Sequence, residues 1–434
     1  MSRINAAVML LRPQNGKNMV AGINGAPAVI PVDVDENCRE AVHVTQRLQE
    51  ELGGLLFLRQ VIDIPGGEER LFVAEAQGRS FAQKLWIPVD ENRAGVIHAL
   101  RTALRGAGAS DHFYDSVVEE ILEAPHLPWS RPDWFNALRR RLDAHFGEPT
   151  DIQPYKLRRG SLTVRAANSH GMYEIHTAAH GMAQWAGDAL HDAESRGLLR
   201  GCRPDLIASF PDLGAELREA PLGTSLAKLG DLNHWATAME SMAELQIRSS
   251  MARSSVTAIS TAELASRFGD CLREWQSQET LGRGFGARSL EWIQDSVSAA
   301  SDVLNASVLP DVLVNGAMTG FTTYAEGSRI QVSEWHPTYI GHPFTLLARL
   351  LSHRAGALAG HTQADLARPF VGAWMRYGRP ADVTKEARAG IVVGSAIQAT
   401  AAWETGRTST AFVPPALGQQ IAGWCETILR GATN

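Results

Sequence analysis

The first third of the chain alternates short apolar runs with polar turns, which is typical of strands joined by tight connections. Four runs rich in apolar or β-branched residues extend over five to seven positions, at residues 6–11, 28–32, 55–61 and 70–75. Between the second and third runs, residues 38–52 place apolar side chains at the spacing of one helix face. The pattern therefore predicts an N-terminal α/β domain, which residues 96–125 extend with a helical segment.

The pattern changes after residue 125. The stretch P-H-L-P-W-S-R-P at residues 125–132 predicts a linker, and residues 133–146 predict a helix. Residues 156–178 then show two strand-type runs on either side of an Asn-Ser-His-Gly turn. We expect a small mixed lobe over residues 126–220.

Helical periodicity dominates from residue 260 onward, and it predicts a mostly helical lobe over residues 221–434. The predicted helices after residue 260 are 262–274, 288–304, 343–358, 362–377, 384–404 and 415–429. The fold class is therefore α/β (α+β), with an N-terminal domain over residues 1–125 followed by two lobes.

Composition narrows the class of protein. The net charge of −6 and the pI near 6.2 give no general basic surface, so we expect no nucleic-acid partner. The four cysteines are scattered without paired spacing, which is typical of a reduced compartment. No apolar run reaches about 18 residues, so we expect no membrane partner. The N-terminus lacks the pattern of a secretion signal. Together these features predict a cytoplasmic protein.

One stretch carries most of the functional information. Residues 313–324 read L-V-N-G-A-M-T-G-F-T-T-Y, residues 329–335 read R-I-Q-V-S-E-W, and residues 336–344 read H-P-T-Y-I-G-H-P-F. This stretch resembles the active-site region of the aminoglycoside phosphotransferase family, L-x-H-G-D-x-H-x-x-N, a hairpin, D-W and G-H-P-F. Gly316, Trp335 and residues 341–344 stand at matching spacing. The resemblance extends weakly from about residue 134 to the C-terminus, and it implies a bilobal kinase-like fold.

The groups that carry the family's chemistry are replaced. Ala317 stands where the resemblance places the base Asp, Thr322 where it places the metal-binding Asn, and Glu334 where it places the second metal Asp. Phosphoryl transfer requires an oriented acceptor hydroxyl and Mg²⁺ held by carboxylate and amide oxygens. Without those groups, the resemblance implies a fold whose usual reaction is lost, so ATP with Mg²⁺ is possible as a cofactor but is not favoured.

A further replacement lies upstream, on the second strand of residues 156–178. The family carries there a lysine that holds the nucleotide phosphates, whereas Ile175 or His176 occupies that position here. None of the five lysines of the chain falls on this strand. Arg158 or Arg165 could contact a phosphate instead, but an arginine fork does not simply replace a point-charge ammonium.

The N-terminal helix carries a second resemblance. Residues 47–53, R-L-Q-E-E-L-G, resemble the end of a Nudix box, R-E-x-x-E-E-x-G, whose helix carboxylates bind a metal ion at a pyrophosphate. The leading glycine and its partner Glu are missing. The resemblance implies a Nudix-like fold without activity, while Glu50 and Glu51 alone are also common on a solvated helix face.

Six residues are candidates for a site. Glu334 and His336 form a candidate acid–base pair, because both side chains titrate usefully when partly buried. Candidate ligand-binding residues lie on the same stretch and on the upstream strand; they are His176, Asn315, Trp335 and Tyr339. Trp335 and His342 also match frame positions and could serve packing alone. His176 and His180 have a spacing that could suit a metal on a helix, but His176 is predicted to end a strand, so we predict no metal site.

Several functions stay open at this point. The first is a pseudokinase-like protein that binds a small metabolite without phosphorylating it. The second is an enzyme with a new reaction on the old scaffold, for example in natural-product metabolism. A phosphotransferase with a non-standard site and an inactive interaction scaffold are the alternatives. The sequence predicts a small-molecule ligand or substrate, and it leaves the oligomeric state open.

Overall fold

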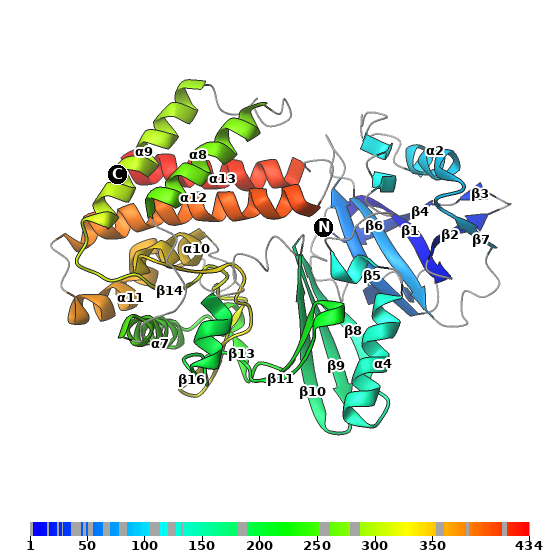
Figure 1. Ribbon diagram of the computed structural model, residues 1–434, viewed down its shortest axis with the longest axis horizontal. Helices are drawn as coiled ribbons and strands as arrows, with labels where there is room; N and C mark the ends of the chain where they lie inside the picture. Colours follow the sequence, from blue (N-terminus) through cyan, green and yellow to red (C-terminus); the bar gives the residue numbers. More distant parts are fainter. Residues whose placement is uncertain are drawn as a thin grey trace. The chain divides into compact units, whose positions relative to one another are not determined.

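The computed structural model describes the chain outside residues 1–2, 15–16, 24–25, 28, 36–44, 47–48, 51–54, 64–69, 78–84, 104–112, 116, 120–126, 132, 159, 180–188, 252–260, 278–286, 353–359, 379–381, 410–414 and 434 (Figure 1). It forms two compact units. The first comprises residues 1–180, 206–219 and 405–417, and the second comprises residues 181–205, 220–404 and 418–434. Each unit is mixed α and β, as the sequence predicts.

The N-terminal part of the first unit is a seven-stranded mixed sheet. Its main order is β3-β2-β1-β6-β5, with β4 paired to β1 and β7 paired to β2. β1 runs parallel to β6 and antiparallel to β2 and β4. The strands are β1 (Arg3–Gln14), β2 (Lys17–Ile23), β3 (Ala26–Pro27), β4 (Val29–Asp35), β5 (Leu55–Asp63), β6 (Arg70–Gln77) and β7 (Leu85–Pro88). The four predicted strands are thus confirmed in β1, β4, β5 and β6.

Strand β1 is buried on both faces. Ala7 and Met9 contribute to one apolar cluster, and Val8 and Leu10 contribute to another. Successive side chains of a strand point to opposite faces, so this pattern identifies β1 as a central strand between two cores. The helix α2 (Arg93–Ala103) contributes buried residues to the first cluster. Of the predicted helix 38–52, only residues 45–46 and 49–50 lie within the described part, and they are helical.

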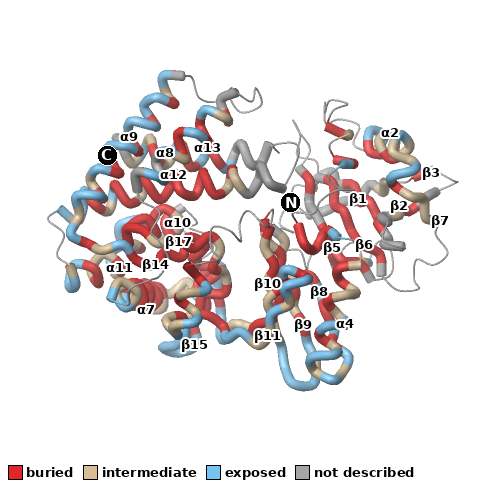
Figure 2. Tube along the Cα trace, viewed as in Figure 1, coloured by how far each residue is buried: buried red, intermediate tan, exposed pale blue. Residues whose placement is uncertain are grey.

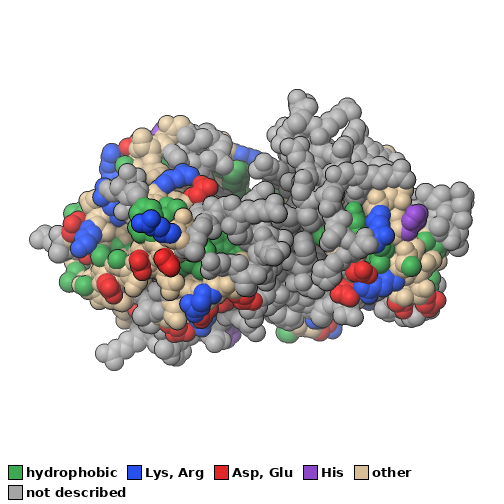
Figure 3. Space-filling view, turned by 90° about the horizontal axis from the view of Figure 1, so that it is seen from above, with side chains coloured by type: hydrophobic (Ala, Val, Ile, Leu, Met, Phe, Trp, Pro, Cys, Tyr) green, Lys and Arg blue, Asp and Glu red, His purple; other side chains and the backbone are tan. Residues whose placement is uncertain are grey.

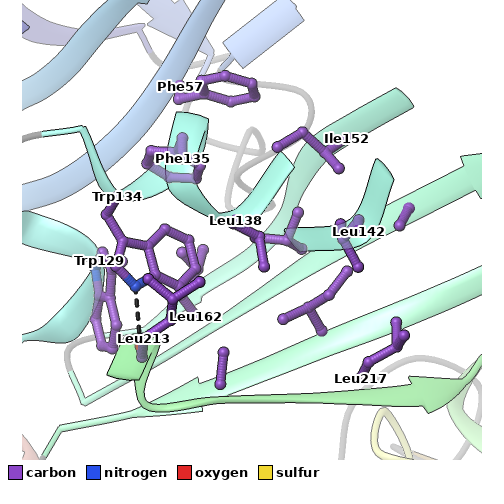
Figure 4. Packing of buried hydrophobic residues seen from close by; sticks show 14 of the residues in the cluster. Phe57, Trp129, Trp134, Phe135, Leu138, Leu142, Ile152, Leu162, Leu213 and Leu217 are labelled. Atoms are coloured by element: carbon purple, nitrogen blue, oxygen red, sulfur yellow. Dashed lines mark hydrogen bonds between the residues drawn. The ribbon is translucent and has the colours of Figure 1, made fainter. Parts of the chain in front are cut away.

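The second part of the first unit is a five-stranded antiparallel sheet of order β11-β12-β10-β9-β8. The strands are β8 (Asp151–Arg158), β9 (Ser161–Asn168), β10 (Gly171–Ala178), β11 (Leu206–Phe210) and β12 (Ala215–Glu219). The helix α4 (Trp134–Phe146) packs its apolar side against one face of this sheet (Figure 4). The Trp134 indole donates a hydrogen bond to the carbonyl of Leu213 at 2.9 Å, which joins the start of the helix to the turn between β11 and β12. The predicted helix and strands are confirmed.

The segment predicted as a linker is instead part of the core. Pro128–Ser130 forms a 3-10 helix with all three residues buried, and Trp129 is 0% exposed. The Trp129 indole donates a hydrogen bond to the carbonyl of Arg59 on β5 at 2.9 Å. Phe57, also on β5, stacks on Phe135 of α4 with ring centroids 4.5 Å apart (Figure 4). Within residues 127–131 the linker prediction is wrong, because these apolar contacts join the N-terminal sheet and α4 in one core.

The second unit contains most of the described helices and two small antiparallel sheets, the three-stranded β13-β15-β16 and the two-stranded β14-β17. Its strands are β13 (Thr224–Ser225), β14 (Val312–Asn315), β15 (Thr323–Glu326), β16 (Arg329–Val332) and β17 (Thr338–Gly341). Its helices, two of which have an end in the first unit, are α6 (Leu226–Leu229), α7 (Leu232–Met251), α8 (Thr261–Ser277), α9 (Ala287–Asn305), α10 (Leu346–Ser352), α11 (Gln363–Tyr377), α12 (Val383–Ser409) and α13 (Pro415–Thr433). The six helices predicted after residue 260 are confirmed within the described residues, and residues 353–358 of the predicted helix 343–358 lie outside them.

Helix α12 is the buried centre of this unit, and Figure 2 shows burial along most of its described length. Two glycines let it approach the segment of residues 343–345. A Cβ on Gly390 would lie 2.6 Å from Phe344, and one on Gly394 would lie 2.2 Å from the carbonyl oxygen of Thr345. Any larger residue would push the helix away, so these glycines place α12 against the segment that follows β17.

The surface carries charges of both signs close together. On the face seen in Figure 3, the coloured Lys and Arg side chains are interspersed with Asp and Glu. Arg93 of α2, for example, contacts Asp115 at 3.3 Å and Glu119 at 3.0 Å. None of the helices in the described part of the chain has the length and apolar character that a bilayer crossing requires.

Candidate functional site

The stretch that resembles a kinase active site folds around Asn315, at the end of β14. β14 pairs antiparallel with β17, with Asn315 opposite Thr338. The Asn315 amide donates to the carbonyl of Glu334 at 3.0 Å and accepts from the backbone N–H of Ala317 at 2.8 Å. Asn315 is 0% exposed. The side chain therefore joins the loop after β14 to the segment that follows β16.

Gly316, the next residue, sits where no side chain fits. Its N–H donates to the carbonyl of Pro337 at 2.8 Å, and its carbonyl accepts from the Gln398 amide of α12 at 3.0 Å. A Cβ at this position would lie 2.9 Å from the Gln398 nitrogen and 3.0 Å from the Pro337 oxygen. The glycine is thus required for the close approach of three segments.

The loop closes on itself through the hydroxyl of Thr322. This hydroxyl accepts from the N–H of Thr319 at 2.8 Å and donates to the carbonyl of Ala317 at 3.0 Å. Thr322 is 0% exposed and Ala317 is 2% exposed. The backbone carbonyl of Thr322 accepts from the N–H of Ser333 at 2.9 Å, which fixes the loop beside the end of β16. The described contacts of this hydroxyl are all within the loop.

Glu334, Trp335 and His336 follow β16 and differ in exposure. The Trp335 ring is 1% exposed, and its N–H donates to the carbonyl of Val332 at 2.8 Å. Glu334 and His336 are each half-buried. Of these three neighbours, the two titratable side chains keep access to solvent while the tryptophan packs in the interior.

Tyr339 and His342 lie in the interior beyond this segment. The Tyr339 hydroxyl donates to the Thr345 hydroxyl at 3.0 Å, and burial raises the pKa of the phenol above its ordinary value. Burial lowers the pKa of His342 to about 4, so its ring is neutral near pH 7. Nδ1 of His342 accepts from the N–H of Phe344 at 3.3 Å, and Nε2 faces Glu386 of α12 at 3.8 Å. Both rings are therefore packed inside the protein and held by internal contacts.

His176, the candidate on the upstream strand, lies in β10 as predicted, and its side chain is 14% exposed. Its Nε2 lies 3.4 Å from the carboxylate of Glu174, whose other oxygen lies 3.6 Å from Nε of Arg165. Although burial by itself raises the pKa of Glu174, the contact with His176 and the charges of Lys156 and Arg165 hold that pKa below its ordinary value. A buried, ionised carboxylate therefore stands beside His176.

The six predicted site residues thus divide by burial. Asn315, Trp335 and Tyr339 are buried with hydrogen-bond partners inside the protein, whereas His176, Glu334 and His336 are half-buried. The structure joins Asn315 and Glu334 directly. Within the described ranges, no group of three or more His, Cys, Asp or Glu side chains is arranged to hold a metal ion. His180, which was considered together with His176 as a possible metal ligand, lies outside those ranges. The roles of the six residues in catalysis or binding stay predictions.

Sequence reasoning missed the partners that hold these residues. The partners are Gln398 for Gly316, Thr319 for Thr322 and Thr345 for Tyr339, and they are distant in sequence or unremarkable in type. The sequence analysis also did not identify Glu174, although the polar pattern of the two strands indicates it. Charged or polar residues recur at every second position of both strands, Thr163 and Arg165 on one and Glu174 and His176 on the other, which predicts a polar sheet face.

Comparison with known proteins gives a fold but no family. No protein-family model matches the chain, and no curated protein matches it in sequence. Among solved structures, a choline kinase from Streptococcus pneumoniae matches with a TM-score of 0.50 and 10% identity, covering 69% of this chain and 98% of that chain. An aminoglycoside phosphotransferase mutant in complex with ADP and hygromycin B matches at 0.47 and 14% identity, covering 69% and 99%. An ethanolamine kinase from Plasmodium vivax matches at 0.46 and 9% identity, covering 77% and 93%.

The choline kinase likeness spans nearly the whole of that enzyme, so this chain has a kinase-like fold over about 69% of its length. At 10% identity the likeness concerns the fold alone. The site residues of this chain must therefore be judged on their own chemistry.

Proposed function

We propose that this chain binds a small metabolite through its kinase-like fold and does not transfer phosphate from Mg-ATP. The observation that supports the proposal is the closed loop at Ala317 and Thr322. Ala317 has no side-chain oxygen to orient an acceptor hydroxyl, and the Thr322 hydroxyl already accepts and donates within the loop. A choline kinase is, by its name, a kinase of a small molecule, which makes a small metabolite the ligand class that we favour.

The donor groups on this loop do not fit Mg²⁺ held against a nucleotide. Mg²⁺ prefers carboxylate, phosphate and water oxygens in octahedral geometry. Glu334 offers one half-buried carboxylate, while Thr322 is a neutral hydroxyl with 0% exposure. Moving that hydroxyl toward a metal would break its two bonds inside the loop. General-base assistance, worth about 10²–10⁴ in rate, has no candidate at Ala317.

Two measurements test this proposal. Calorimetric titration of the full chain with Mg-ATP should show no tight binding, and γ-labelled ATP should pass no label to choline, ethanolamine or an aminoglycoside. Label on any acceptor above a protein-free control would refute the proposal. A Glu334→Gln variant then separates the alternatives, because a phosphotransferase that uses Glu334 for its metal would lose that activity.

A second candidate function is an enzyme with a changed reaction, for example in natural-product metabolism. It is favoured by the exposure of Glu334 and His336, which flank the buried Trp335 and keep access to solvent. Glu334→Gln and His336→Ala variants should then lose conversion of the metabolite, while a control variant at the exposed Glu326 retains it. Equal product from all variants would exclude these two residues as catalysts.

We infer that the N-terminal sheet is a Nudix-like domain without hydrolase activity. Its mixed sheet, with β1 parallel to β6 and antiparallel to β2 and β4, supports the inference. The incomplete box at residues 47–53 supports the lack of activity. Mg²⁺-dependent hydrolysis of nucleoside diphosphate derivatives, to a nucleoside monophosphate and the phosphorylated second group, would contradict it. The same domain could serve as an interaction scaffold. Its shared core with α4 and the segment before it, through Phe57 and Trp129, is compatible with that role.

A further inference from the structure

The chain contains three Asn-Gly pairs, at residues 15–16, 24–25 and 315–316, and the last of them lies within the described part of the structure. Such a pair is chemically labile in an open peptide, because glycine has no side chain to shield its backbone nitrogen. That nitrogen attacks the side-chain amide carbon of the asparagine, a C–N bond forms, and ammonia leaves. Water then opens the resulting cyclic imide at one of its two carbonyls, which produces aspartate or isoaspartate.

The fold holds both reacting groups of the pair at residues 315–316 in other bonds. The attacking nitrogen, that of Gly316, donates its hydrogen to the carbonyl of Pro337 at 2.8 Å. The Asn315 side chain donates to the carbonyl of Glu334 at 3.0 Å, and it accepts from the N–H of Ala317 at 2.8 Å. Asn315 is also 0% exposed, which keeps water from the side chain. Ring closure therefore requires that these bonds break first.

The loop of residues 317–322 controls whether those bonds can break. The Thr322 hydroxyl closes this loop by donating to the carbonyl of Ala317 at 3.0 Å. On the other side of the pair, the carbonyl of Gly316 accepts from the Gln398 amide of α12 at 3.0 Å. Because the Asn315 oxygen is bonded to the N–H of Ala317, the side chain is released only when the loop opens.

We propose that the pair Asn315 and Gly316 is a latent modification site, which converts to aspartate or isoaspartate when the loop of residues 317–322 opens. The reaction consumes water and releases ammonia, so it requires no enzyme and no cofactor. The new carboxylate has no N–H to donate to the carbonyl of Glu334, and isoaspartate also lengthens the backbone. Two oxygens would then face each other in the interior, which is unfavourable. The loop therefore stays weakened after the reaction. The inference goes beyond the proposed function, because it requires no ligand.

Peptide mass analysis of the full chain measures this conversion, because the exchange of an amide for a carboxyl group raises the mass of the peptide. At mildly alkaline pH, the wild-type pair at 315–316 should convert at least about a hundredfold more slowly in the folded protein than in urea, since four buried hydrogen bonds hold it closed. In urea the pairs at 15–16 and 24–25 provide the internal reference for an open chain. Equal rates for the pair at 315–316 with and without urea would overturn the inference.

A variant tests whether opening of this loop, and not unfolding of the whole chain, limits the reaction. Thr322→Val removes the hydroxyl that closes the loop, so it should speed conversion in the folded protein at least about tenfold. The matched control, Thr237→Val on α7, should leave the rate unchanged. Equal rates in the two variants would overturn the inference. The comparison of folded and unfolded wild type decides the question even where Thr322→Val does not fold.

Asn315→Asp reproduces one product of the reaction and tests its lasting effect. The carboxylate would face the carbonyl of Glu334 without a hydrogen to donate, so this variant should unfold at a lower urea concentration than the wild type. An Asn315→Asp protein as stable as the wild type would contradict the weakening of the loop. Label transfer from ATP would instead refute the proposed function and leave this inference intact.

Discussion

Replacing Thr322 by Val tests whether the closed loop is structural. Valine has nearly the shape of threonine but lacks the hydroxyl, so the substitution removes the hydrogen bonds of that hydroxyl to Thr319 and Ala317 and changes little else. The N–H of Thr319 and the carbonyl of Ala317 would lose their 2.8 Å and 3.0 Å partner in a position with 0% exposure. Each buried polar group left without a partner costs about 1–3 kcal/mol. We expect a loss of about 2–4 kcal/mol in the free energy of unfolding, since the loop can relax in part.

Urea unfolding followed by tryptophan fluorescence measures this loss. The matched control is Thr237→Val on α7, where the hydroxyl bonds the carbonyl of Asn233 in its own helix at 2.9 Å. That variant should change the free energy of unfolding by less than about 0.5 kcal/mol. A Thr322→Val protein as stable as the control would refute the reasoning, because the hydroxyl would then not be needed by the loop and could serve a ligand.

Three further predictions concern pH and packing. The folded-state pKa of His342 is lowered to about 4, below the unfolded value near 6.5, so its stabilising contribution is present above pH 6.5 and is lost as the pH falls toward 4. We expect about 2 kcal/mol less stability at pH 5 than at pH 7.5, a difference that a His342→Asn variant should lack in parallel urea titrations. Gly394→Ala places a methyl group 2.2 Å from a backbone oxygen and should cost about 1–3 kcal/mol, whereas Gly372→Ala, with nothing within 4 Å, should stabilise α11 by up to about 1 kcal/mol in thermal unfolding. Phe57→Ala should cost about 3–5 kcal/mol and weaken α4 as well as β5, and hydrogen exchange confined to β5 would contradict the shared core.

The hydrophobic pattern predicted most elements correctly because the information is local. Four strands of the N-terminal sheet (β1, β4, β5 and β6), the hairpin of β9 and β10, and the helices after residue 260 follow from period-two and period-3.6 patterns, whereas β2, β3 and β7 were not predicted. The frame of Gly316, Trp335 and residues 341–344 was equally visible, and it implied the kinase-like fold that the choline kinase likeness supports. The linker prediction at residues 125–132 failed because prolines mark a break in regular structure, not exposure. Trp129 fills the core beside β5, and no local pattern contains that contact.

By itself, the sequence determined which chemical groups are present and absent, so the missing carboxylate at Ala317 and the missing amide at Thr322 needed no coordinates. Only the tertiary structure decided what the remaining groups do. Asn315 meets the carbonyl of Glu334, and Gln398 meets that of Gly316, across 19 and 82 positions of the chain. Glu174 meets Arg165 and His176 because strand register sets which side chains share a face. Burial and partner choice are properties of segments brought together by packing, and a single chain read in order carries no record of those distances.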